Sequence, residues 1–216
     1  MTGTRLSAGD GGAEAGVTLV ETVVAMALVS VFMAVFITGV VQMHQSVREN
    51  ESMSEAQSQI NIAFQRLDRE VRYASGISIP GQTAAPSSIP YVEYRTAPGG
   101  TPRCTQLRLY NRILQMRTWN PATTATPPAG WRPLVTSTTT ATPATGQPAP
   151  IAQAGPFAVW TADSTRVFQR LRVSLRTTAG AGQYQTGRET SIVFTALNTS
   201  ADTEAGTVCM APRPTS

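Results

Sequence analysis

The chain has 216 residues, 41% of them hydrophobic, and a formal net charge of +4. That length allows one membrane helix and one modest globular domain. With a single histidine, His44, and no P-loop, Gly-x-Ser-x-Gly or Gly-x-Gly-x-x-Gly motif, the sequence offers no catalytic constellation, so we expect neither an enzyme nor a cofactor nor a bound metal.

The first element in chain order is an apolar segment that begins beside one acidic residue. After Glu21, the run from Thr22 to Val47 contains no Asp, Glu or Arg over 26 residues. About 20 residues suffice to cross a bilayer as a helix, and a cleavable secretory signal has an apolar region of only about 7–15. We therefore expect a transmembrane helix over 17–41. Burying an ionised carboxylate in lipid costs at least about 2.5 kcal/mol, so Glu21 needs a partner or a special position.

The residues around this carboxylate form a recognisable motif, Gly16-Val17-Thr18-Leu19-Val20-Glu21. It resembles the prepilin signal of type IV pilins, type II secretion pseudopilins and competence pseudopilins, although Val17 stands where that family more often has Phe or Met. The resemblance implies that prepilin peptidase removes a leader, residues 1–16, by cutting between Gly16 and Val17. It further implies N-methylation of Val17 and pairing of Glu21 with the amine of a neighbouring subunit.

Helical periodicity continues beyond the apolar segment. No Pro or Gly interrupts Gln42–Ser75, and Ser75-Gly76 predicts the end of an amphipathic helix over 42–75. A helix from Val17 to Ala74 is ~87 Å long, too long for a small domain to bury, so its first half must lie in a membrane or an assembly. The apolar stripe contains Met43, Val47, Met53, Ala56, Ile60, Ala63, Phe64, Leu67, Val71 and Ala74.

Charged residues near the end of this helix are spaced for ion pairs such as Arg66–Glu70 and Asp68–Arg72. The segment Phe64–Ala74 also looks like the helix end of larger minor pilins and J-type pseudopilins. In those proteins it packs against a sheet.

Beyond Gly76 the pattern becomes alternating, which predicts strands. A tight turn at Asn111 separates the second strand from the third, and a Gly-rich hairpin at Ala179–Gly187 separates the last two. The expected strands are Tyr91–Arg95, Cys104–Tyr110, Arg112–Thr118, Phe157–Thr161, Arg166–Arg176 and Glu189–Leu197.

The segment Asn120–Pro156 is dense in Thr, Ala and Pro, and we expect most of it to lack order of its own. Trp131, Leu134 and Val135 are the residues that we expect to anchor it on the domain. Two cysteines, Cys104 and Cys209, read as one disulfide in an exported chain, with two free buried thiols as the alternative.

One predicted strand carries an unusual concentration of arginine. Alternation over 166–176 places Val167, Leu171, Val173 and Leu175 on an inward face. The outward face then carries Phe168 with Arg166, Arg170, Arg172 and Arg176. Such a ladder can follow a phosphate backbone, although a solvated sheet face in a lysine-free protein is the simpler interpretation. Nucleic acid is therefore a minor candidate partner.

Together these patterns predict an α+β protein: one long N-terminal helix packed on an antiparallel sheet in an extracytoplasmic head, 76–216. The hypothesis is a minor pilin or pseudopilin, a single-pass protein of the inner membrane that prepilin peptidase processes and that assembles with other subunits. The alternatives are a DNA-uptake or adhesion subunit of a competence-type filament and a plain membrane-anchored extracellular domain. The sequence leaves open whether the filament is a pilus, a secretion pseudopilus or a competence filament.

Overall fold

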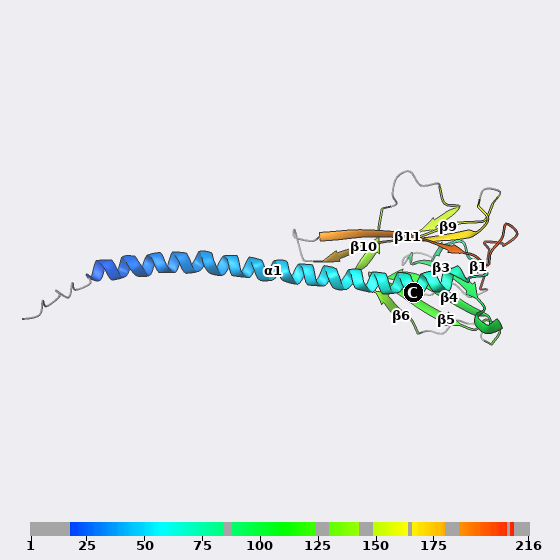
Figure 1. Cartoon of the computed structure of the whole chain (residues 1–216), viewed down its shortest axis with the longest axis horizontal. Helices are drawn as coiled ribbons and strands as arrows, with labels where there is room; N and C mark the ends of the chain where they lie inside the picture. Colours follow the sequence, from blue (N-terminus) through cyan, green and yellow to red (C-terminus); the bar gives the residue numbers. More distant parts are fainter. Residues whose placement is uncertain are drawn as a thin grey trace, which may run out of the picture. The chain divides into compact units, whose positions relative to one another are not determined.

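The structure is a computed structural model that describes residues 18–83, 88–123, 130–142, 149–163, 166–179, 186–206 and 208–209. The chain divides into two compact units, Met1–Arg48 and Glu49–Ser216. We call the second unit the head domain. One helix and two antiparallel sheets account for its regular structure, in agreement with the α+β prediction (Figure 1).

Helix α1 spans Leu19–Arg72, ending three residues before the end of the expected range, 42–75. Within the head domain one face of α1 is buried and contributes Ile60, Ala63, Phe64, Leu67 and Val71 to the core. These are members of the predicted apolar stripe, so the stripe is confirmed over this stretch.

The two predicted ion pairs form along partly exposed positions of the helix, and Glu70 of the first pair also contacts the buried Tyr94. Arg66 contacts Glu70 at 2.9 Å, and Arg72 contacts Asp68 at 2.7 Å. Pairs four residues apart on a helix stabilise it by about 0.2–0.5 kcal/mol each.

The first sheet has the order β1-β3-β4-β5-β6, with β2 paired to β3. The central hairpin β4–β5 turns at Asn111 and Arg112, whose φ angles are 48° and 61°. Positive φ at both positions matches the right-handed strand twist, and this confirms the tight turn expected there. The strands are β1 (Gly76–Ile77), β2 (Gly81–Gln82), β3 (Pro90–Thr96), β4 (Arg103–Tyr110), β5 (Ile113–Trp119) and β6 (Arg132–Val135), with the short 3-10 helix η1 (Pro98–Gly100) between β3 and β4.

The second sheet has the order β11-β10-β9-β8, with β7 paired to β10 beyond the end of β9. Two sheets therefore form where one was expected. The strands are β7 (Thr138–Thr140), β8 (Ala152–Ala154), β9 (Phe157–Trp160), β10 (Gln169–Ala179) and β11 (Thr186–Ala196).

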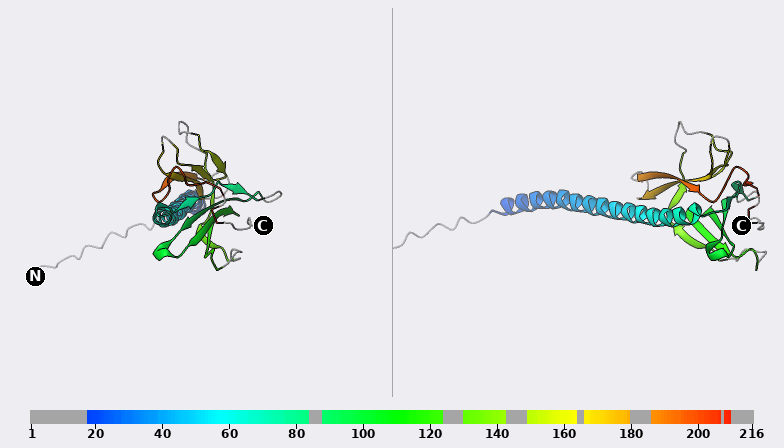
Figure 2. Two further views of the ribbon diagram at one scale, coloured as in Figure 1. Left: turned by 90° about the vertical axis from the view of Figure 1, so that its right-hand side faces the viewer. Right: turned by 45° about the vertical axis from the view of Figure 1, so that its right-hand side comes forward.

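A single apolar core joins α1 to both sheets. Figure 2 shows the course of α1 and of the strands within the head domain. It contains Tyr94 and Leu107 from the first sheet, Leu171 from the second, and an edge-to-face pair between Phe64 and Phe194 with ring centroids 5.8 Å apart. Aromatic pairs of this geometry contribute about 0.5–1.5 kcal/mol beyond the area they bury.

Two expectations about the head need correction. The segment Asn120–Pro156 contains β6, β7 and β8, because backbone pairing to β5, β9 and β10 supplies the order that its composition does not. Of its expected anchors, Val135 is buried in the core and Leu134 packs against it. Val167, expected to face inward, is 67% exposed, because β10 begins only at Gln169.

Candidate functional site

The first described residues form the N-terminal cap of α1. The hydroxyl oxygen of Thr18 accepts a hydrogen bond from the backbone N–H of Glu21 at 3.3 Å, which satisfies one of the free donors of the first turn. Thr18 and Glu21 thus occupy the two positions of a capping box. Gly16 and Val17, the expected cleavage and methylation sites, lie outside the described residues.

The helix dipole alone does not compensate Glu21 in an apolar medium. A carboxylate in the first turn gains about 0.3–1 kcal/mol from the positive end of the helix. Its transfer into hydrocarbon costs at least about 2.5 kcal/mol. The difference leaves Glu21 in need of a cation whenever this end of α1 is removed from water.

The surface of α1 in the first unit is apolar and uncovered. Every residue from Thr18 to Arg48 is exposed, including Leu19, Phe32 and Phe36. Among the described residues α1 is the one helix that is long and apolar enough to cross a membrane, and none of its most apolar 18-residue window is buried. A candidate membrane span is therefore present at the position expected from the sequence.

Three hydroxyl groups on this surface bond back to the helix itself. Thr22 donates to the carbonyl of Leu19 at 2.8 Å, Ser30 to that of Met26 at 2.7 Å, and Thr38 to that of Ala34 at 2.8 Å. A hydroxyl donor left unsatisfied in hydrocarbon costs several kcal/mol. These hydroxyl donors are therefore satisfied internally. Between Thr18 and Val41, Glu21 is the one residue with an ionisable side chain.

The two cysteines are bonded to each other in the head domain. Cys104 at the start of β4 and Cys209 form a disulfide with a Cα–Cα distance of 5.8 Å and a sequence separation of 105 residues. Trp119 and Val208 pack around the bond and form a small apolar cluster apart from the main core. The bond therefore fixes the C-terminal segment to the first sheet.

The four arginines of the predicted ladder do not form one exposed array. Arg172 is only 3% exposed, with its guanidinium 5.0 Å from the centroid of the Trp160 ring, and burial lowers its pKa. Arg166 precedes β10 and pairs with Asp163 at 2.7 Å, while Arg176 pairs with Glu189 at 3.5 Å. Arg170 alone of the four is exposed without an ion pair among the described residues.

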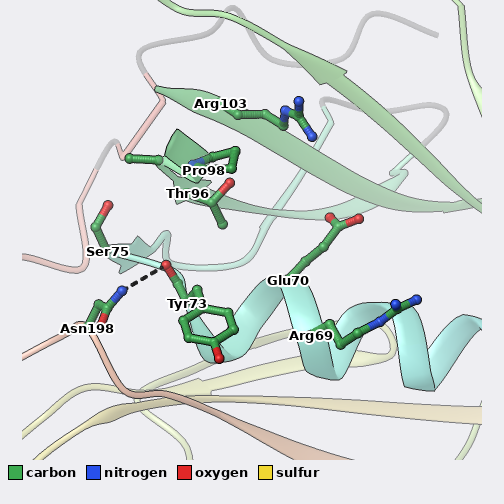
Figure 3. A pocket seen from close by; sticks show the side chains of 9 residues that line it. Arg69, Glu70, Tyr73, Ser75, Thr96, Pro98, Arg103 and Asn198 are labelled. Atoms are coloured by element: carbon green, nitrogen blue, oxygen red, sulfur yellow. Dashed lines mark hydrogen bonds between the residues drawn. The ribbon is translucent and has the colours of Figure 1, made fainter. Parts of the chain in front are cut away.

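A cavity of about 370 Å³ lies where α1 ends against the first sheet (Figure 3). Arg69 and Glu70 of α1 and Tyr73 just beyond it line one side, and Thr96 and Arg103 line the other. The Glu70 carboxylate is already occupied, because it accepts hydrogen bonds from the Tyr94 hydroxyl at 2.6 Å and from Arg66 at 2.9 Å. The arginine side chains are thus the groups left to hold a ligand, and they would favour an anion.

The face of the first sheet opposite the core carries a buried polar chain that the sequence did not reveal. Gln106 donates to Glu93 at 2.6 Å and accepts from Arg117 at 2.7 Å. Burial raises the pKa of Glu93 from 4.5 to about 7, against the opposing effects of the Gln106 hydrogen bond and the Arg117 charge. The guanidinium carbons of Arg108 and Arg117 lie 3.9 and 4.4 Å from the ring centroid of Trp131.

This network explains how Trp131 anchors its segment: it stacks on arginines rather than entering the apolar core. Burial lowers the pKa of Arg108 and of Arg117, and the Arg108 charge lowers that of Arg117 further. Alternation along β3 is the signal that could have located Glu93, because its neighbours Val92 and Tyr94 both face the core.

Within the described residues no group of three or more His, Cys, Asp or Glu side chains is placed to hold a metal ion. In comparisons with known proteins, no protein-family model, curated protein or solved structure matches this chain.

Proposed function

We propose that the chain is a minor pilin or pseudopilin, a subunit of a type IV pilus or of a type II secretion-like filament. One observation carries the proposal: Glu21 is the sole acidic residue on an exposed apolar helix surface, and it follows the Gly16-Val17 junction at the prepilin spacing. In this proposal prepilin peptidase removes residues 1–16 and methylates the new amine of Val17.

The chemistry of assembly follows from charge. Cleavage creates a cationic amine at Val17, and methylation of an amine retains its charge. In the filament this amine pairs with Glu21 of a neighbouring subunit. Breaking a buried ion pair by removing one partner typically costs about 3–5 kcal/mol, so subunits in the wrong axial register are disfavoured. A single polar contact within an apolar interface fixes register in coiled coils by the same principle.

The apolar helix surface suits both environments that the subunit would occupy. The precursor resides in the inner membrane, where Leu19–Val41 lies in lipid and the head domain is extracytoplasmic. On assembly the same surface exchanges lipid for the helices of other subunits, which are equally apolar. The transfer therefore carries little hydrophobic cost, and the Val17–Glu21 pairing decides whether a subunit is accepted.

A minor role is favoured over a major one. The mature chain would have about 200 residues, which leaves room for an elaborate head. Helix α1 contains no Pro, whereas many major pilins have one near the middle of this helix. Subunits of this kind prime assembly or lie at a filament tip.

The absence of lysine gives a direct test of processing. Because the sequence contains no lysine, an amine-reactive reagent can label only the N-terminal amine. We expect mass spectrometry of protein from the native host to find Val17 as the first residue, carrying one methyl group. A mature protein that retains Met1 and the leader would refute the proposal.

Substitution of Glu21 tests the pairing separately from the processing. Glu21→Val should still be cut after Gly16 and remain in the membrane, yet be absent from sheared filaments or from the membrane filament fraction. Thr22→Val is the matched control, because it alters the adjacent residue without removing a charge, and it should assemble. Normal incorporation of Glu21→Val would contradict the pairing.

A further inference from the structure

Strand β11 ends the second sheet, and within the part of the chain that the structure describes no strand pairs with its outer edge (Figure 1). Ser174 of β10 donates its N–H to Pro156 at 2.9 Å, on the β9 side. Along an antiparallel strand, alternate residues form backbone hydrogen bonds to opposite neighbouring strands. Because the even-numbered Ser174 bonds on the β9 side, the odd-numbered residues of β10 bond to β11. Their partners on β11 are even-numbered, as in the pair Val173 and Ile192.

The odd-numbered residues of β11 therefore direct their N–H and C=O groups to the free edge. Leu197, just beyond the strand, confirms the direction, because its N–H donates to the Arg72 carbonyl at the end of α1 at 2.9 Å. Five residues of β11 face the free edge in this way: Gly187, Glu189, Ser191, Val193 and Thr195. Among the described residues, none of these five makes a backbone hydrogen bond to a group outside the sheet.

This edge lacks the usual protection against strand pairing. Natural edge strands are commonly short, or carry Pro, Lys or a bulge. Strand β11 has 11 residues, no Pro and no Lys, and its register with β10 is continuous from Thr186 to Ala196. Its C-terminal half is uncharged, with Ile192 38% and Val193 43% exposed.

A groove of about 740 Å³ runs between β11 and α1. Phe64, Ile192 and Phe194 form its apolar floor, and Asn61 and Gln65 of α1 contribute amides to its wall. Its volume lies within the range of about 300–1,000 Å³ that is typical of binding sites. A free strand edge beside a helix, above an apolar floor, is the arrangement in which an extended peptide adds as a further strand.

The charges beside the groove select an acidic occupant. Asp68 lines the groove but is neutralised by Arg72 at 2.7 Å. Arg69 also lines it, is exposed, and has no ion pair among the described residues. Arg188, on the same strand face as Ile192, is likewise exposed and without an ion pair in that part of the chain.

We propose that the groove between β11 and α1 binds an extended segment of another polypeptide, with apolar side chains at alternate positions and carboxylates at its ends. The segment pairs with the free edge of β11, and its apolar side chains meet Phe64 and Ile192. A second copy of this chain is a poorer occupant, because its own groove carries the same Arg69 and its own β11 the same Arg188, neither with an ion pair among the described residues. The site does not depend on processing at Gly16.

The test uses the full chain in detergent micelles with its disulfide intact. The probe is a fluorescein-labelled heptapeptide, Asp-Val-Thr-Val-Thr-Val-Glu, and binding is followed by fluorescence anisotropy. Val193→Pro removes an N–H that points to the free edge and leaves the β10 ladder intact, as edge positions allow. We expect it to weaken binding by at least about tenfold, while Val193→Ala stays within about threefold of the unaltered chain. Equal affinities of the Pro and Ala variants would overturn the proposal.

A second measurement leaves the protein unaltered, so that it does not depend on the folding of a variant. Methylating the backbone nitrogens that face β11, on alternate residues of the peptide, should abolish binding. Methylating the other alternate set should preserve it. Arg69→Gln should weaken binding and reduce its dependence on salt. Equal loss from both methylated sets would overturn the proposal. The proposal would also be overturned if the chain did not bind the peptide and instead self-associated in a way that Val193→Pro abolishes.

Discussion

Replacing the buried carboxylate of Glu93 should change how the stability of the head domain depends on pH. Glu93 is 5% exposed, and burial is the largest cause that raises its pKa from 4.5 to about 7. Between these two values the folded protein holds a proton that the unfolded chain releases. The favourable contribution of Glu93 is therefore complete below about pH 4.5 and is lost as the pH rises to about 7.

The magnitude follows from the size of the shift. A difference of about 2.5 pH units, at about 1.36 kcal/mol per unit, corresponds to about 3 kcal/mol. Glu93→Gln keeps an acceptor for the Gln106 amide, which lies 2.6 Å from the carboxylate, and removes the titration. At pH 8 the free energy of unfolding of the variant should exceed that of the unaltered chain by up to about 3 kcal/mol, and near pH 4 the two should agree.

Tryptophan fluorescence during urea unfolding measures the free energy of unfolding of the head domain selectively. All three tryptophans, Trp119, Trp131 and Trp160, lie in the head domain. The full chain in detergent can therefore be followed without a signal from the first unit. Glu204→Gln, at an exposed position, removes the same charge and serves as the control. Parallel stability curves for Glu93→Gln and the unaltered chain between pH 5 and pH 8 would refute the reasoning.

Further predictions concern the disulfide and the core. Replacing both Cys104 and Cys209 by Ser should lower the free energy of unfolding by up to about 4–5 kcal/mol, because the bond closes a loop of 105 residues; an unchanged urea midpoint after reduction would contradict this. Phe64→Ala should cost about 3–5 kcal/mol, because it removes a buried ring packed on Phe194, whereas exposed Ile62→Ala should cost less than about 0.5. Similar urea midpoints for these two variants would show that the Phe64 ring is not part of the core.

Local periodicity predicted much of the fold. The stripe from Ile60 to Val71 follows from helical spacing alone, and the buried face of α1 in the head matches it. The hairpin at Asn111 likewise depends on a residue type that tolerates positive φ. Both features are fixed by residues near one another in the sequence, which is why the sequence suffices.

Features set by distant partners could not be read in this way. Alternation placed Arg172 on the face opposite Leu171, but it did not reveal that Trp160 of β9 would cover the guanidinium. Strand β7 forms because β10 extends beyond β9 and offers it a partner. The Glu93–Gln106–Arg117 chain required the register of three strands, which no local pattern specifies.

The buried face of α1 in the head has a consequence for the biogenesis of the protein. The last partners of α1 come from the far end of the chain: the Leu197 N–H donates to the Arg72 carbonyl across 125 residues, and Phe194 packs against Phe64. At about 5–20 residues per second, synthesis of that interval takes roughly 6–25 s. Through that time the helix face remains without its final partners, so the head can complete its fold only after nearly all of residues 49–198 have been synthesised.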